Sequence, residues 1–149
     1  MPPARPHGRF LAGEVGELAG VSGTTIGQWA RRGYIRASQS AADPHVYSLE
    51  DVVEASVVHA LLESGVRHAA IRRAIEALGE YGDWPLTVAP IATTTGNGGP
   101  RIVLAERGGV FALSGRGWQR LAVEPPLRRL RAAVPGLLAT GAEAPDGTE

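Results

Sequence analysis

Apolar residues near the beginning of the chain repeat at helical spacing in two short segments. Residues 11–19 have apolar positions at i, i+4, i+7 and i+8, which predicts a short helix with one buried face. Residues 23–32 have apolar positions at i, i+3 and i+4 and predict a second helix. Ser22 is suited to cap this second helix, and Gly33 is suited to end it. The expected buried positions of the pair are Leu11, Val15, Leu18, Val21, Ile26 and Trp29.

The segments that follow predict a wing and two more helices. Two short apolar runs, residues 34–35 and 45–47, flank the polar loop of residues 36–44, and this arrangement predicts a β-hairpin, or wing. Residues 48–64 and 67–80 each repeat apolar positions at helical spacing. The first of these helices opens on a serine followed by acidic residues, which is typical of a helix N-terminus.

From Trp84 onward the pattern changes from helical to extended, and Pro85 is expected to block a helix there. Short apolar runs separated by glycine-rich turns predict a small β-meander; they are residues 86–92, 101–106 and 110–113. Apolar positions between residues 127 and 134 predict a short helix. The expected fold class is therefore mostly α: a winged helix-turn-helix with two further helices, followed by a small β-meander or hairpin and a short C-terminal helix.

The same pattern divides the chain into four parts. We expect a flexible arm (residues 1–9), a helical domain (10–82), a small β-rich module (84–134) and a disordered tail (135–149). The tail is rich in Ala, Gly, Pro and Glu, a composition that cannot bury much apolar surface. A few bare strands are only marginally stable, so the β-rich module should pack on the helices or on another chain.

The helix of residues 23–32 presents a polar face whose side chains carry hydroxyl, amide and guanidinium groups. Its members are Thr24, Thr25, Gln28, Arg31 and Arg32. Such groups pair with phosphates and with base edges in the major groove of DNA. Ser22 at the helix start is a further candidate for DNA contact, and the wing residues Arg36, Ser38, Gln39 and His45 could reach backbone phosphates. The alternative interpretation is a polar face that is only solvated.

Composition narrows the functional classes. The 149 residues include no cysteine, which excludes disulfides, thiolate catalysis and cysteine-bound zinc. The four histidines are scattered, so we expect neither a metal site nor a cofactor. No phosphate-binding loop and no nucleophile–base set is present, and we expect no enzyme. No run approaches the roughly 18–20 apolar residues that span a bilayer, and no secretory signal is seen, so we expect a cytoplasmic protein without a membrane contact.

Charge is distributed unevenly although the formal net charge is zero. Residues 1–47 hold five arginines against three acidic residues, whereas residues 48–83 hold three arginines against seven. This distribution of charge is expected if only the first segment contacts phosphates. All 15 basic residues are arginines, a usage that a GC-rich genome also produces.

The order of these features resembles the MerR family of transcription regulators. The matching stretches are FLAGEVGELAGVSGTTIGQWARRGYI (residues 10–35), VYSLEDV (46–52) and ESGVRHAAIRRAI (63–75). The resemblance implies a winged helix-turn-helix that binds DNA, and it covers about half of the chain. The stretch after Trp84-Pro85-Leu86 resembles MerR-headed antitoxins of the VapB type, although the second helical domain of those proteins is missing here.

Two positions depart from the family pattern. Gly27 stands where the recognition helix usually carries an arginine, and His45 stands near the usual wing arginine. The long dimerising helix and the effector region of metal- and drug-sensing members are also missing, so we expect neither kind of sensing.

The sequence therefore predicts a bacterial DNA-binding transcription regulator whose partner is double-stranded DNA. We expect a homodimer on a pseudo-palindromic site, with residues 84–134 providing the dimer surface. One alternative is an antitoxin that holds a toxin through residues 84–134, and another is an excisionase-like architectural protein of a phage or plasmid. A third is a protein-interaction adaptor whose helix-turn-helix no longer binds DNA.

Overall fold

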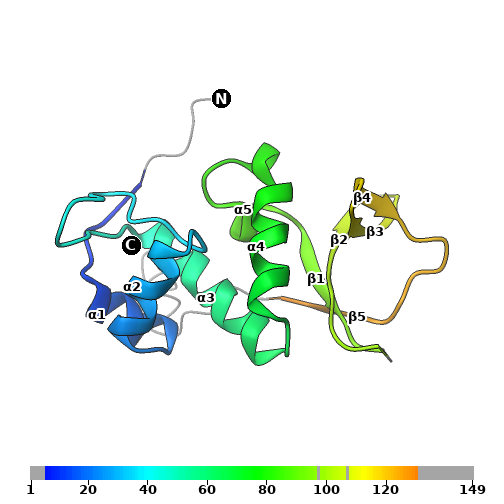
Figure 1. The fold of residues 1–149 in the computed structure, drawn as a ribbon, viewed down its shortest axis with the longest axis horizontal. Helices are drawn as coiled ribbons and strands as arrows, with labels where there is room; N and C mark the ends of the chain where they lie inside the picture. The colour runs from blue at the N-terminus through cyan, green and yellow to red at the C-terminus, as the bar shows by residue number, and fades with distance from the viewer. Residues whose placement is uncertain (1–5, 97, 107, 131–149) are drawn as a thin grey trace, which may run out of the picture. The chain divides into compact units, whose positions relative to one another are not determined.

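The structure, a computed structural model, describes residues 6–96, 98–106 and 108–130 (Figure 1). Its described residues form two compact units, residues 6–56 and 57–130. The division lies inside helix α3 (Leu49–Glu63), upstream of the boundary expected at residues 82–84. Within the described ranges, no helix combines the length and the apolarity that crossing a membrane requires.

The first unit contains a helix-turn-helix. Helix α1 (Ala12–Ala19) and helix α2 (Gly23–Arg31) are joined by a three-residue turn that starts at Gly20, whose φ of 89° ends α1 in the left-handed conformation. Val15, Ile26 and Trp29 are buried as expected. Leu18 and Val21 are half-buried.

Leu11 was expected in the buried stripe, and this prediction is wrong because its side chain is 50% exposed. Leu11 occupies the N-cap position of α1, outside the helix, where its backbone N–H donates to the Glu14 carboxylate at 2.9 Å. The helical repeat that placed it on the buried face therefore does not extend to this residue.

The wing differs from the predicted hairpin. Residues 34–35 are buried but form no strand, because the Tyr34 N–H bonds the Trp29 carbonyl at 2.9 Å and continues the turn that ends α2. Tyr47 instead pairs with Phe10, through two backbone hydrogen bonds of 2.8 Å. A single bridge between Ser40 and Val46 closes the loop itself.

The second unit packs short helices with an antiparallel sheet. Its helices are the C-terminal part of α3, then α4 (His68–Ala77), the 3₁₀ helix η1 (Gly79–Tyr81) and α5 (Pro85–Val88). Helix α5 occupies the start of the first expected strand, because proline at the first helical position favours a helix rather than blocking it.

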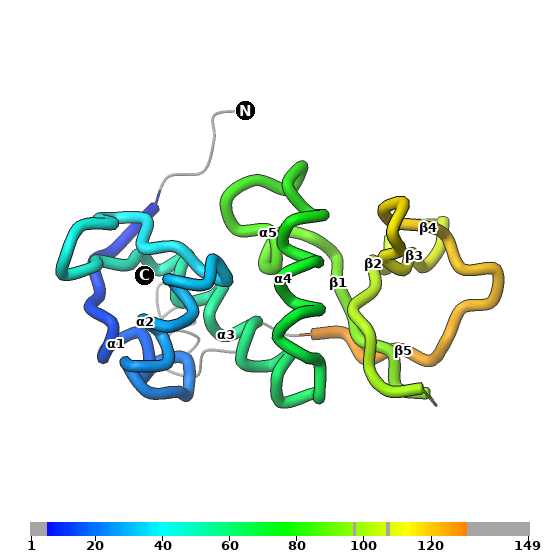
Figure 2. The backbone as a smooth tube through the Cα atoms, in the orientation of Figure 1, coloured from blue at the N-terminus to red at the C-terminus, as the bar shows by residue number. Residues whose placement is uncertain are grey.

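The sheet has the strand order β4-β3-β2-β1-β5 (Figure 2). Its strands are β1 (Ile91–Thr94), β2 (Ile102–Glu106), β3 (Gly109–Ser114), β4 (Gly117–Arg120) and β5 (Leu127–Arg129). The first three correspond to the expected meander, and β4, which the sequence did not indicate, extends it. Residues 121–126 then lead back so that β5 pairs with β1, with Ala92 opposite Arg129. Ala92, Val103, Val110 and Ala112 form the buried cluster of one sheet face.

The expected C-terminal helix is contradicted at residues 127–129, which form β5. Leu127 fits a strand because it packs against the buried cluster of the sheet. Residues 131–134 of that expected helix, and the expected tail, lie outside the described residues. The expectation of a mostly α protein is not confirmed, because a five-stranded sheet accompanies the helices.

Candidate nucleic-acid interface

Helix α2 presents one exposed polar stripe. Thr24, Gln28 and Arg31 are exposed and share a helix face, because residues four and three positions apart line up at 3.6 residues per turn. Arg32, the residue that follows α2, is also exposed, and Thr25 is half-buried. The opposite face buries Ile26 and Trp29, which fixes the direction of the stripe.

Ser22 has a structural role at the start of this stripe. Its hydroxyl accepts a hydrogen bond from the Thr25 N–H at 3.0 Å and donates to the Thr25 hydroxyl at 2.9 Å. It satisfies one of the free amides of the first helical turn. The helix start is therefore held by Ser22, and both hydroxyls of the pair are engaged within the protein.

Gly27 lies in the middle of the stripe. A Cβ atom on this residue would meet the Nη1 atom of Arg31 at 3.3 Å, so the Arg31 side chain folds back along the helix over Gly27. The Arg31 guanidinium also influences the pKa of Tyr47. Burial, the largest cause, and the Asp51 charge raise the pKa of Tyr47, and Arg31 opposes them.

Two of the predicted wing contacts make bonds within the protein. Gln39 donates from its side-chain amide to the Gly8 carbonyl at 2.7 Å. A ring nitrogen of His45 lies 3.2 Å from the Ala42 carbonyl, and the ring meets that of Tyr47 edge-on at 6.2 Å. Arg36 is exposed. Gln39 and His45 thus stabilise the wing through contacts within the protein.

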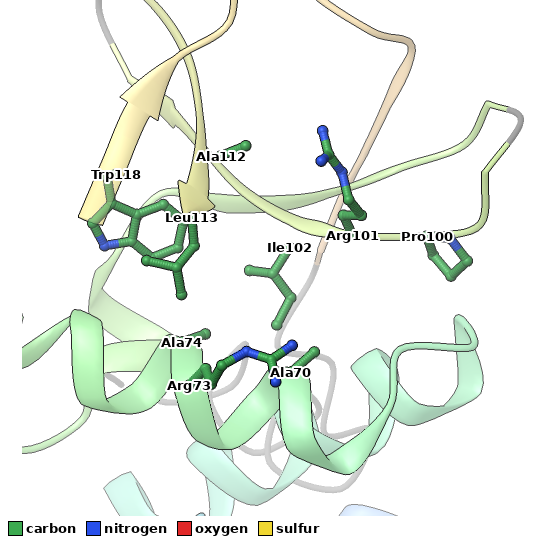
Figure 3. Close-up of a pocket in the computed structure, with 9 residues that line it drawn as sticks. All are labelled: Ala70, Arg73, Ala74, Pro100, Arg101, Ile102, Ala112, Leu113 and Trp118. Atoms are coloured by element: carbon green, nitrogen blue, oxygen red, sulfur yellow. The ribbon is translucent and has the colours of Figure 1, made fainter. Parts of the chain in front are cut away.

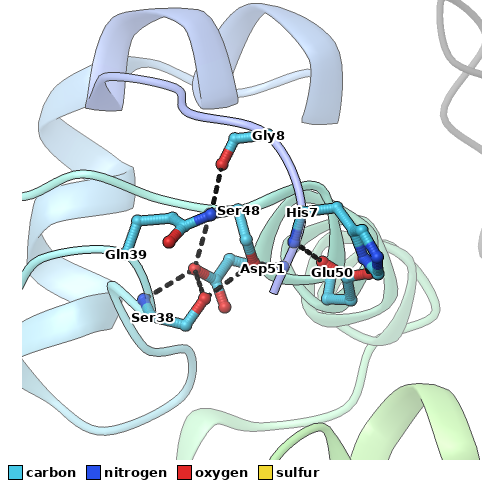
Figure 4. A network of polar contacts seen from close by, with 7 residues as sticks. All are labelled: His7, Gly8, Ser38, Gln39, Ser48, Glu50 and Asp51. Carbon is cyan, nitrogen blue, oxygen red and sulfur yellow. Dashed lines mark hydrogen bonds and ion pairs between the residues drawn. The ribbon is translucent and has the colours of Figure 1, made fainter. Parts of the chain in front are cut away.

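Asp51 anchors the base of the wing to α3, which the sequence analysis missed. Its Oδ2 atom accepts from the backbone N–H of Ser38, the hydroxyl of Ser38 and the backbone N–H of Ser48, at 2.7–2.8 Å (Figure 4). Its own N–H donates to the Ser48 hydroxyl at 3.1 Å. The serine and acidic residues at this helix start indicated a cap, but no sequence signal indicated the bond to Ser38.

The segment that precedes α1 is attached to the same helix. His7 donates its backbone N–H to Glu50 at 2.8 Å, and its ring lies 2.7 Å from the other carboxylate oxygen (Figure 4). Burial raises the pKa of Glu50, but the hydrogen bonds from His7 outweigh it and leave this pKa below its ordinary value. Residues 7 and 8 of the expected flexible arm therefore contact α3 and the wing.

The first unit is not basic as a whole. Its described residues hold four arginines and six acidic residues. Two of the acids, Asp51 and Glu54, are buried. The cations on and beside the stripe of α2 are Arg31 and Arg32. Attraction to phosphates would depend on this local placement rather than on net charge.

Comparison with known proteins identifies the first part of the chain. Residues 10–78 match the family model of MerR HTH family regulatory proteins, which confirms the resemblance over slightly less than half of the 149 residues. This segment is similar to the helix-turn-helix regions of that family, and it contains the stripe of α2 and the wing. No curated protein and no solved structure matches the chain.

Proposed function

We propose that the protein is a sequence-specific DNA-binding transcription regulator that places α2 in the major groove. The observation that carries this proposal is the exposed stripe of Thr24, Gln28 and Arg31 on a capped helix of a MerR-type region. An amide and a guanidinium recognise base edges in the major groove, where each base pair presents a distinct pattern.

Each side chain has a proposed role. Thr24, Thr25, Gln28 and Arg31 contact base edges, and the exposed Arg32 and Arg36 hold phosphates. Gln39 and His45 stay predicted phosphate contacts, although each already makes a bond within the protein. Ser22 contributes mainly by capping α2.

We also propose that the protein acts as a homodimer on a pseudo-palindromic site. Helix-turn-helix proteins commonly bind two half-sites in this way. Strands β4 and β5 are the two edges of the sheet, and edge strands provide backbone groups for a partner. Light scattering at several protein concentrations tests this oligomeric state. The antitoxin and excisionase alternatives stay predictions.

The proposed DNA contact is tested by selecting bound sequences from a random DNA pool and measuring affinity for the selected site. Replacing both Arg31 and Arg32 by alanine should weaken binding roughly ten- to hundredfold. It should also lower the salt dependence by about one ion for each lost phosphate contact. The matched control replaces Arg72 and Arg116, two exposed arginines of the second unit that lie outside the edge strands β4 and β5.

The two double variants separate a specific contact from a loss of charge. The control should bind the selected site much as the unchanged protein does, and circular dichroism should show the same helical content in all three proteins. Equal losses in both variants, or no loss in either, would contradict the assignment of α2 to the groove.

A further inference from the structure

We propose that the second unit contains a binding pocket for a small organic carboxylate with one flat apolar ring. The pocket lies between α4 and the sheet and has a volume of about 120 Å³ (Figure 3). Its apolar lining comes mainly from these two elements and includes Ala70, Ala74, Ile102, Ala112, Leu113 and Trp118. All of these residues belong to the same compact unit.

The charged groups that line this pocket are both cations. Arg73 extends from α4, whereas Arg101, which immediately precedes β2, points away from α4 on the opposite side of the strand from Ile102 (Figure 3). Both side chains are exposed, and within the described residues neither guanidinium has a hydrogen bond or an ion pair. Arg73 is therefore the cation on the α4 side of the pocket, and an anion bound there would pair with it.

The size and the walls of the pocket suit a single ring. An apolar cavity of roughly 150 Å³ is known to accommodate benzene, and this pocket is somewhat smaller but open to solvent. The Trp118 indole N–H donates to the Ala77 carbonyl at 3.0 Å, which holds the ring in place as one wall. An aromatic ring stacked near an indole gains more than its buried area alone provides.

A neighbouring hollow determines where the carboxylate lies. This hollow, of about 470 Å³, shares Arg73 and Leu113 with the pocket and is bordered by Glu76. The Glu76 carboxylate disfavours an anion on its side of Arg73. The carboxylate of the ligand therefore lies on the side of Arg73 that faces the pocket, where Arg73 can bind it through two parallel N–H donors, and the ring lies against Ile102 and Trp118.

The proposal is tested by following amide and indole N–H signals of the full-length protein by NMR during titration with three probes. Benzoate has both the ring and the charge, benzamide keeps the ring without the charge, and acetate keeps the charge without the ring. Benzoate should shift the Trp118 indole signal in a saturable manner. The other two probes should bind at least about tenfold more weakly than benzoate.

Two substitutions on one helix provide the matched control. Arg73→Gln should weaken benzoate binding about tenfold or more, whereas Arg72→Gln removes a neighbouring exposed charge of α4 outside the pocket and should leave binding unchanged. Arg101→Gln, at a side chain that points away from α4 (Figure 3), should change it little. Any of three results would overturn the proposal. They are equal affinity for benzoate and benzamide, equal effects of the Arg72 and Arg73 substitutions, and NMR signal shifts spread over many arginine-rich surfaces. These measurements use no DNA, so their result does not depend on the proposed regulatory function.

Discussion

Gly16 of α1 lies so close to the turn before α2 that a Cβ atom on it would stand 2.5 Å from the Val21 carbonyl oxygen. A Cβ atom on Gly23 would likewise meet the Cα atom of Gly13 at 3.0 Å. Both neighbours are backbone atoms, which cannot rotate away as a side chain can. The absence of two side chains therefore permits the close approach of α1 and α2 that directs the polar stripe outward.

We expect Gly16→Ala to destabilise the protein by about 1–3 kcal/mol, the usual cost of forcing an extra methyl group into a packed site. Gly13→Ala is the matched control, because nothing lies within 4 Å of a Cβ atom at that position of the same helix. Alanine there should be neutral or slightly stabilising. Urea denaturation followed by circular dichroism measures both free energies of unfolding, and similar values for the two variants would contradict the close-approach argument.

Gly27→Ala should raise stability and lower DNA affinity. Alanine is favoured over glycine in a helix interior by about 1 kcal/mol, and the atom that the new methyl group would meet is the flexible end of Arg31. The same methyl group would stand in the middle of the stripe that faces the groove. Denaturation and binding to the selected site measure the two effects, and a variant that binds DNA as tightly as the unchanged protein would show that Gly27 is not near the duplex.

The helix-turn-helix was predictable because its determinants are local in the sequence. A serine that caps α2, a glycine after the helix and apolar residues at helical spacing act within a few positions of one another. The exposed stripe of Thr24, Gln28 and Arg31 follows directly from the same repeat. The contacts that support the wing were not predictable, because Gln39 bonds Gly8 and Ser38 bonds Asp51 across long separations.

The second unit shows the limit of local patterns. Residues 127–129 hold one apolar residue followed by two arginines, a stretch too short to distinguish a helix from a strand, and the pairing with β1 decides in favour of β5. Pro85 was interpreted as a helix breaker, although proline favours the first position of a helix such as α5. The strand therefore depends on a partner that is distant in the sequence, whereas the helix start follows a local preference that was interpreted in the wrong direction.

Asp51→Asn should destabilise the protein by about 1.5–3 kcal/mol, the range for hydrogen bonds to a charged group. One carboxylate oxygen accepts all three bonds that join Ser38 and Ser48, and an uncharged amide accepts them less strongly. Asp43→Asn is the control, since it removes the same charge from an exposed position in the wing loop. Thermal unfolding compares the two, and an equal shift in melting temperature would mean that charge rather than the anchor is responsible.

The Tyr81 hydroxyl donates a hydrogen bond to Glu106 at the end of β2, which raises the pKa of Tyr81 to about 12. The bond needs a protonated phenol, so its contribution to stability is complete below the ordinary tyrosine pKa of 10.0 and is lost as the pH rises through 12. Glu106→Gln removes the negative charge and should return this pKa toward 10.0. Ultraviolet titration of the phenolate measures it, and subtraction of the Tyr81→Phe titration removes the other tyrosines, including Tyr47, whose pKa burial also raises. A Tyr81 curve that is the same with Glu106 and with glutamine would exclude the carboxylate as the cause.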